Sequence, residues 1–384
     1  MTAPSTPTAL ILSGGGARGA YQVGVIKAVS ELFPKHAHNP FSIICGTSAG
    51  AINAVGIAAS ANNFRLASKK LEYMWLGLHV NHVYKAGGWD ILKSLGRLGL
   101  SFLHQGIATD DRPLSLLDNA PLRELLHSNI QFRNIQKRIN AGYLDALAIT
   151  AAGYTNGESV CFYQGRNDLE PWQRGHRVGR PANITPAHLL ASSAIPMVLP
   201  AEKIGDEYFG DGALRQLSPI SPALHLGADR LFVIGVSGNA SHKNKHEVEA
   251  HTPSLAQMAG HIYNSAFIDS LEADLEHFIR INDLIGMLEN ENPSFDHHEL
   301  RRAEALLIQP SIEFDEVAAK HHGDLPFAMR TLLRTTGATK QGGGSSMSSY
   351  LLFESNFCKD LIQHGYEDGM NQEDDIRYFF EEKV

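Results

Sequence analysis

This sequence has few cysteines, no excess of positive charge and no long apolar run. Its 384 residues include three cysteines, Cys45, Cys161 and Cys358. This odd, widely spaced set excludes a disulfide framework and favours a reducing compartment. The formal net charge is −8, which argues against a general nucleic-acid binder and against adsorption to anionic lipid by charge alone.

No apolar run approaches the roughly 20 residues that span a bilayer. Residues 191–201 are interrupted by two serines and two prolines, and the first eight residues carry no basic side chain. Neither a membrane span nor a signal peptide is therefore expected, and we expect a cytoplasmic protein. A content of 43% apolar and 19% charged residues is typical of one large globular domain or two ordinary ones.

The first half of the chain alternates strand and helix patterns. Residues 9–12 and 42–45 are short apolar runs, and each is followed by a glycine-rich turn and a helical pattern, at 20–33 and 51–61. This repeat predicts an α/β fold with a mostly parallel central sheet flanked by helices. We expect a catalytic α/β domain over residues 8–238. A mainly helical C-terminal extension, residues 239–384, is expected to pack on it, with polar loops at 239–252, 289–298 and 337–349.

The second turn has the pattern G-x-S-x-G, as Gly46-Thr47-Ser48-Ala49-Gly50. After a strand and before a helix, this pattern is typical of a nucleophile elbow, in which a sharp turn exposes the serine Oγ. Gly46 and Gly50 would permit the turn and the close approach of other backbone. The alternative is a serine in an ordinary glycine-rich turn.

The first turn, Gly14-Gly15-Gly16-Ala17-Arg18-Gly19, also follows a strand. Its G-x-G-x-x-G spacing is compatible with a dinucleotide site, but the next strand ends without the acidic residue that such a site needs. We favour an oxyanion hole, in which backbone N–H groups bind a substrate carbonyl oxygen. Arg18 is interpreted as a surface charge or as part of an ion pair that braces the loop.

A serine hydrolase also needs a base, and Asp211 is the best-placed acid downstream of the elbow. It lies in Phe209-Gly210-Asp211-Gly212-Ala213, just after an expected hairpin strand. An Asp-Gly pair is by itself an ordinary turn signal.

The three motifs, in this order, resemble the patatin-like phospholipases. The family pattern is a G-G-G-x-R-G loop, a G-x-S-x-G serine and a D-G-[AG] aspartate. The segment 191–196, Ala-Ser-Ser-Ala-Ile-Pro, is similar to the segment in the family that leads from a helix to a proline. Ser13 stands where plant members have Asp, so the resemblance is to the bacterial branch and covers about residues 8–238.

The resemblance implies a lipid acyl hydrolase of the phospholipase A or lysophospholipase type. Ser48 would be the nucleophile and Asp211 the base of a Ser–Asp dyad. Gly14, Gly15 and Gly16 would form the oxyanion loop, with Arg18 and Gly19 bracing it. The substrate would be a lipid met in transient contact with a membrane surface. We expect no metal, no other cofactor and no nucleic-acid partner.

Nineteen histidines keep other interpretations open. A Ser-His-Asp triad esterase of the α/β-hydrolase type could recruit His225, His261 or another later histidine. A metal site at His79-Val80-Asn81-His82 is disfavoured because no further ligands follow at suitable spacing. A non-catalytic lipid-binding protein on the same fold is a third alternative.

Residues 89–103 form an amphipathic helical pattern, with apolar side chains at helical spacing and Lys93 and Arg97 on the more polar side. Such a helix can pack on the core, or it can cap the acyl pocket and meet lipid.

Overall fold

A ten-stranded sheet lies at the centre of the protein. The computed structural model describes residues 6–103, 113–237, 254–291, 302–337 and 345–381. The strand order is β10-β9-β1-β2-β3-β4-β6-β5, and β8 pairs with both β3 and β7. The run from β10 to β3 is parallel, whereas β3 pairs antiparallel with β4 and with β8. The strand bounds are β1 Thr8–Leu12, β2 Ile43–Thr47, β3 Ala146–Gly153, β4 Ser159–Gly165, β5 Trp172–Arg174, β6 Arg177–Pro181, β7 Glu202–Ile204, β8 Glu207–Asp211, β9 Arg230–Ile234 and β10 Glu304–Ile308.

Alternating side chains of the central strands enter two separate cores. Leu10 and Leu12 of β1 pack on the face covered by α1 and α2, whereas Ala9 and Ile11 pack on the opposite face. A strand buried on both faces must be apolar throughout. The structure therefore explains the uninterrupted apolar runs in the sequence and confirms the predicted α/β architecture.

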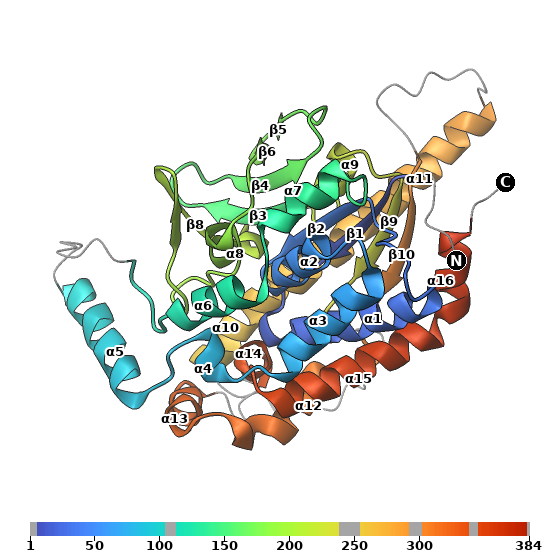
Figure 1. Ribbon diagram of the computed structural model, residues 1–384. Helices are drawn as coiled ribbons and strands as arrows, with labels where there is room; N and C mark the ends of the chain where they lie inside the picture. The colour runs from blue at the N-terminus through green and yellow to red at the C-terminus, as the bar shows by residue number, and fades with distance from the viewer. Residues whose placement is uncertain (1–5, 104–112, 238–253, 292–301, 338–344, 382–384) are drawn as a thin grey trace.

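Helices cover both faces of the sheet. Figure 1 shows α1, α2 and α3 in front of the sheet and α11 behind it, and the side chains of α9 and α11 belong to the second core. The helix bounds are α1 Gly19–Leu32, α2 Ala49–Ala59, α3 Phe64–Leu76, α4 Val80–Val83, α5 Gly88–Leu103, α6 Ala120–Asn129, α7 Arg133–Asn140, α8 Pro186–Ser192, α9 Ser221–His225, α10 Leu255–Asn264, α11 Ser270–Glu291, α12 Phe314–His321, α13 Phe327–Thr335, α14 Ser345–Leu351, α15 Ser355–Asn371 and α16 Glu373–Phe380.

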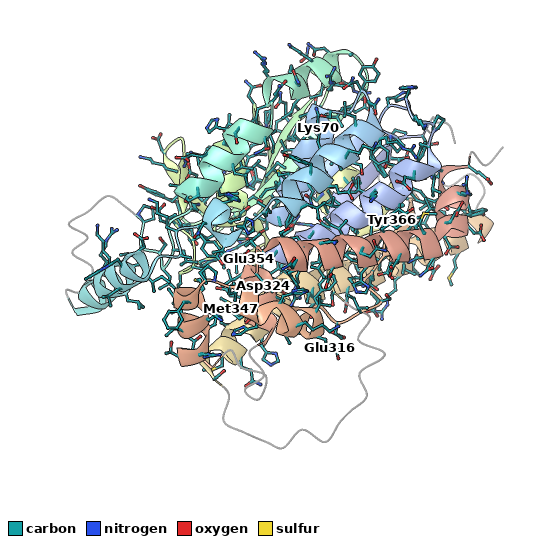
Figure 2. All side chains as sticks on the ribbon, turned by 60° about the horizontal axis from the view of Figure 1, so that its bottom comes forward. Lys70, Glu316, Asp324, Met347, Glu354 and Tyr366 are labelled. Atoms are coloured by element: carbon teal, nitrogen blue, oxygen red, sulfur yellow. The ribbon has the colours of Figure 1, made fainter. Side chains whose placement is uncertain are left out.

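The C-terminal region does more than add helices. Its strand β10 extends the parallel sheet beyond β9, which the sequence did not indicate. Helix α15 lies along α1 at very close range, because a Cβ at Gly365 would collide with the backbone of Tyr21. Figure 2 shows Tyr366 of α15 beside α1, where its hydroxyl donates to Glu31 at 2.9 Å. The division at residue 238 stays a prediction. The polar loop expected at 239–252 lies outside the described residues, as do 292–298 and 338–344 of the other two expected loops. The loop prediction was wrong for 289–291, which end α11, and for 345–349, which begin α14.

The amphipathic segment forms α5, which projects from the body of the protein (Figure 1). Ile91 is buried, whereas Trp89 is 83% exposed and Leu92 59% exposed. Helix α5 therefore does not pack its whole apolar face on the core. Among the described helices, none has the length and apolar content needed to cross a bilayer.

Candidate active site

Ser48 lies on a strained turn between β2 and α2. Its φ of 55° and ψ of −126° fall outside the ordinary regions for a side-chain-bearing residue. The flanking glycines are required: a Cβ at Gly46 would lie 2.7 Å from Cα of Ala51, and one at Gly50 would lie 2.6 Å from the Ser13 carbonyl oxygen. This strand–turn–helix geometry is that of a nucleophile elbow, with the N-terminus of α2 directly after the serine.

Ser48 and Asp211 come together although 163 positions separate them in the chain. Ser48 Oγ donates a hydrogen bond to Asp211 Oδ2 at 2.7 Å. The other carboxylate oxygen of Asp211 accepts from the amide of Ala213 at 3.0 Å. Asp211 ends β8, which pairs with the end of β3, and β3 is the neighbour of the strand that leads to Ser48. Adjacent strands thus bring the two side chains into contact.

Burial changes the acidity of Asp211. The residue is 1% exposed, and burial raises the pKa of its carboxyl group to about 7, against the opposing hydrogen bonds from Ser48 and Ala213. Desolvation penalises the charged form. A carboxylate with this pKa is a far better proton acceptor at neutral pH than an ordinary aspartate.

The glycine loop presents unused backbone donors beside Ser48. The amides of Gly14, Gly15 and Gly16 donate no hydrogen bond to any described group, which is uncommon for buried N–H groups. A Cβ at Gly14 would lie 3.1 Å from Ser48 Cβ, so the loop and the serine are in direct contact. Gly16 has a φ of +55°, a conformation that glycine adopts without strain.

Arg18 ties this loop to the C-terminal region. Its guanidinium forms an ion pair with Asp315 at 3.0 Å and donates to Ser349 Oγ at 2.7 Å. Its charge lies 4.0 Å from the ring centroid of Tyr350. The arginine is buried, so of the two interpretations offered by the sequence, the geometry matches an ion pair and not a surface charge. Gly19 packs tightly, since its Cβ would lie 2.9 Å from that of Ala49.

Two residues at and just after the end of α8, Ser192 and Ala194, connect Ser48 with Asp211. Ser192 Oγ accepts the amide N–H of Ser48 at 2.8 Å and donates to the carbonyl of Thr150. The carbonyl of Ala194 accepts the amide N–H of Asp211 at 2.9 Å. The sequence of residues 191–196 indicates only a resemblance to a family segment. No local pattern indicates these contacts, because both partners are distant in the chain.

An apolar pocket leads away from Ser48. It is lined by the glycine loop, the elbow with α2, the regions of α3, α4 and α6, the segment after α8 and the end of α14 with the residues that follow, namely Gly16, Ser48, Ala49, Ile52, Met74, Trp75, Leu78, Val83, Tyr84, Leu122, Leu125, Ser193, Ile195, Leu199, Leu351 and Phe353. None of these side chains is charged. The free volume is about 40 Å³, little more than one water molecule occupies in the liquid.

The C-terminal region covers the reacting groups. Ser48 is only 2% exposed. Phe267 packs on Gly14, and together with Tyr350 and Ala213 it forms a small apolar cluster. Phe267 lies in a π-helical turn, Ser265–Asp269, that joins α10 to α11. In this conformation Ser48 is therefore almost closed off from solvent.

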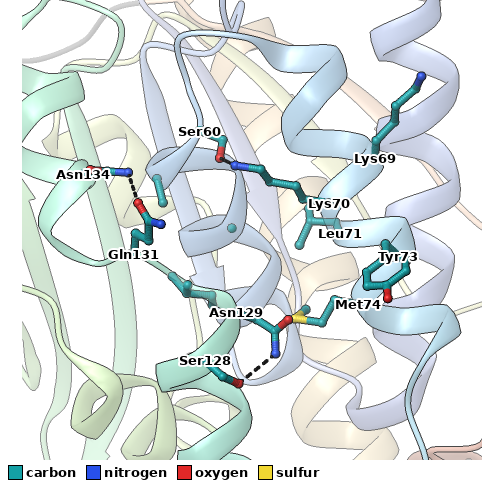
Figure 3. A pocket seen from close by; sticks show the side chains of 13 residues that line it. Ser60, Lys69, Lys70, Leu71, Tyr73, Met74, Ser128, Asn129, Gln131 and Asn134 are labelled. Carbon is teal, nitrogen blue, oxygen red and sulfur yellow. Dashed lines mark hydrogen bonds between the residues drawn. The ribbon is translucent and has the colours of Figure 1, made fainter.

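A larger cavity lies elsewhere. It has a volume of about 380 Å³ and is bounded by α2, α3, α6 and α7. Figure 3 shows Lys70 reaching across it toward Ser60, while Lys69 points away; the Lys70 Nζ to Ser60 Oγ distance is 3.2 Å. Its lining lies toward the C-terminal end of α2, far along the helix from Ser48, and includes no predicted site residue. The candidate residues Ser48 and Asp211 therefore lie outside this cavity.

Two of the histidines in the alternative interpretations, His225 and His79, contact other groups. His225 Nδ1 lies 2.8 Å from the Ser221 carbonyl, and the ring stacks on Trp172. His79 pairs with Glu354 at 2.8 Å. His261 lies on α10. Within the described ranges, neither Ser48 nor Asp211 has a hydrogen bond to a histidine. No group of three or more potential metal ligands occurs among those residues.

Similarity to two solved structures is distant. VipD from Legionella pneumophila shares 14% identity, with a TM-score of 0.31, and the match covers 94% of this chain and 68% of VipD. The complex of SpcU with ExoU from the type III secretion system of Pseudomonas aeruginosa gives 15% identity and a TM-score of 0.26. That match covers 91% of this chain and 71% of the matched chain.

Comparison of sequences is more informative. A curated protein described as a "cGAMP-activated phospholipase" from Pseudomonas aeruginosa is 39% identical over 66 residues, 17% of this chain. The chain spans about a fifth of the length of that relative (20%). A family model described as "Patatin-like phospholipase" matches residues 10–224, more than half of the chain. This match includes the glycine loop, Ser48 and Asp211, and the chain therefore belongs to the patatin-like phospholipase family.

Proposed function

We propose that this protein is a lipid acyl hydrolase of the phospholipase A or lysophospholipase type. It would cleave carboxylic esters through an acyl-serine intermediate, with Ser48 as nucleophile and Asp211 as base. The observation that carries the proposal is the 2.7 Å hydrogen bond from Ser48 Oγ to the buried carboxylate of Asp211. Membership of the family supports hydrolysis of lipid esters in general.

The reaction follows from this contact. Asp211 takes the proton of Ser48 Oγ as that oxygen attacks the ester carbonyl carbon. The carbonyl oxygen becomes an oxyanion, which the free amides of Gly14, Gly15 and Gly16 stabilise. When the C–O bond to the alcohol breaks, protonated Asp211 supplies the proton that the leaving oxygen needs. Water then attacks the acyl-serine and loses a proton to Asp211. When the bond to Ser48 Oγ breaks, Asp211 returns this proton to Ser48 Oγ, and the fatty acid is released.

The apolar lining of the pocket suits the acyl chain of the substrate in chemical character. It has no charged lining side chain, so a charged head group would be placed outside it. Its free volume of about 40 Å³ is far below the about 300 Å³ of a small ligand site. Leu351 and Phe353, which follow the cover formed by Tyr350, would have to shift with it to admit the chain.

Helix α5 supplies the contact with the lipid surface in this proposal. It begins at Gly88, shortly after Val83 and Tyr84 of the pocket wall. Trp89 and Leu92 are exposed on it, and an amphipathic helix of this kind binds where head groups meet acyl chains. Apolar contact, and not net charge, would dominate this binding, because the chain as a whole is acidic.

Two alternatives predict different results. A Ser-His-Asp esterase would need a histidine in contact with Ser48, and a non-catalytic lipid-binding protein would not need a strained serine beside a buried base. The deciding experiment compares the protein with its Ser48→Ala variant on a mixed-lipid extract, with products identified by mass spectrometry. Free fatty acid that appears only with the unaltered protein supports the proposal. Equal product from both proteins refutes it.

A further inference from the structure

The hydroxyl of Ser193 is buried without a partner. Ser193 is 8% exposed, and its Oγ has no hydrogen bond to any described group. Leaving a buried hydroxyl unpaired costs about 1–3 kcal/mol, so native proteins rarely do so without a reason.

The backbone around this hydroxyl is firmly held. The amide of Ser193 donates to the Leu189 carbonyl at 3.0 Å, and its carbonyl accepts from the amide of Ile195 at 2.9 Å. On one side, Ser192 binds the amide of Ser48, and on the other, Ala194 binds the amide of Asp211. Ser193 therefore occupies the centre of a segment that is fixed to both reacting residues.

Ser193 also lines the apolar pocket together with Ser48. The other polar side chains of that lining have partners: Ser48 donates to Asp211, Trp75 Nε1 donates to Asn53, and the Tyr84 hydroxyl donates to the Leu351 carbonyl. Within the described lining, Ser193 Oγ is thus the one side-chain donor able to bind a substrate oxygen without breaking an existing hydrogen bond.

Two other serines allow a comparison. Ser68 and Ser348 also have buried hydroxyls without a described partner, but neither lines this pocket. An unpaired hydroxyl by itself therefore does not identify a binding residue. The combination of an unpaired hydroxyl with a position in the same pocket as Ser48 occurs only at Ser193 among these three serines.

We infer that Ser193 is a substrate-positioning residue whose hydroxyl hydrogen-bonds an oxygen of the scissile ester in the pocket beside Ser48. The inference rests on the proposed ester hydrolysis and adds a third side chain to the proposed site, beside Ser48 and Asp211. The bound group is a neutral ester oxygen, since no charged side chain lines the pocket to balance an ion. The hydroxyl holds the ester while Asp211 and the glycine amides act on it.

The test is to measure hydrolysis of p-nitrophenyl butyrate and thermal unfolding for Ser193→Ala, Ser193→Cys and the matched control Ser68→Ala. We expect Ser193→Ala to lower kcat/KM about tenfold, the size of one net hydrogen bond, mainly through kcat. Its melting temperature should stay the same or rise, because an unpaired buried hydroxyl has been removed. Cysteine is a weaker donor of similar size, so the kcat/KM of Ser193→Cys should lie between those of Ser193→Ala and the unaltered protein. Ser68→Ala should keep full activity.

A purely structural role for Ser193 predicts the opposite pattern, with a lower melting temperature and no specific change in kcat. Unchanged kcat/KM in Ser193→Ala, in a protein that hydrolyses the ester normally, would overturn the inference and leave the proposed function intact. If the unaltered protein neither hydrolyses the ester nor reacts with a fluorophosphonate at Ser48, the proposed function itself fails.

Discussion

The side-chain hydroxyl of Ser192 accepts the backbone N–H of Ser48 at 2.8 Å. The same hydroxyl donates to the carbonyl of Thr150 on β3, so Ser192 links the backbone of Ser48 to that of β3. Ser48 has a strained backbone, and strain of this kind persists only where the surroundings enforce it. We infer that Ser192 of α8 holds the proposed nucleophile in position from outside the elbow motif.

We therefore expect Ser192→Ala to slow hydrolysis. The change leaves the buried amide of Ser48 without a partner, which costs about 1–3 kcal/mol, and it releases the turn that aims Oγ at the substrate. The rate of fluorophosphonate labelling at Ser48 should fall together with kcat. Ser192→Thr, which keeps the hydroxyl, should retain most of both. Labelling of a folded Ser192→Ala protein at the normal rate would count against this role.

The pH dependence should reflect Asp211. Only the ionised carboxylate can accept the proton of Ser48, and burial raises its pKa to about 7. We expect kcat/KM to decline on the acid side with an apparent pKa near 7, well above the about 4 of a free aspartate. The measurement is a pH–rate profile on an uncharged ester. An acid limb centred near pH 4 would show that Asp211 is not desolvated in the working enzyme.

The same pKa shift links stability to pH. A folded-state pKa of about 7 against the ordinary 3.8 means that folding favours the protonated acid. Protonated Asp211 contributes about 4 kcal/mol to the free energy of unfolding. This contribution is complete below about pH 4 and is lost as the pH rises through 7. The Asp211→Asn variant avoids this loss, so its advantage in melting temperature over the unaltered protein should grow between pH 5 and pH 8. A constant difference across that range would contradict the linkage.

The glycine loop gives a test of the oxyanion role. A Cβ at Gly16 would collide with the backbone carbonyl of Tyr350, and its φ of +55° disfavours any other residue. Gly16→Ala should therefore misplace the free amides and reduce kcat by about 10²–10³, the effect of losing one oxyanion donor. Gly323→Ala, where the added Cβ meets nothing within 4 Å, is the control. Full activity in a folded Gly16→Ala protein would exclude Gly16 from the oxyanion hole.

Helix α5 gives a test of the lipid contact. Leu92→Glu places a charge on its exposed apolar face, so co-sedimentation with phosphatidylcholine vesicles should fall several-fold while hydrolysis of a soluble ester is retained. Leu66→Glu is the matched control, since Leu66 is also an exposed leucine on a helix, α3. Equal vesicle binding by the two variants would show that α5 is not the contact.

Local patterns predicted much of the fold and of the candidate site. Ser48 and the glycine loop are each marked by glycines at fixed spacing after a buried strand, and the apolar runs identify the parallel strands. β10 was missed, because the four-residue apolar run that follows Glu304 does not distinguish a strand from part of a helix. Ser192, Ser193, Phe267 and Tyr350 were missed for a different reason. Their importance comes from contacts across the chain, and no spacing in the sequence records such contacts.

The central claim is that Asp211, and not a histidine, takes the proton from Ser48. Its most direct test is hydrolysis of an alkyl ester by Asp211→Asn beside alanine variants of the nineteen histidines, each checked for folding. Proton transfer by a positioned base contributes about 10²–10⁴-fold. We therefore predict that Asp211→Asn loses at least about 10²-fold in kcat and that no histidine variant approaches this loss. A folded but inactive histidine variant, together with an Asp211→Asn enzyme that keeps substantial turnover, would contradict the dyad.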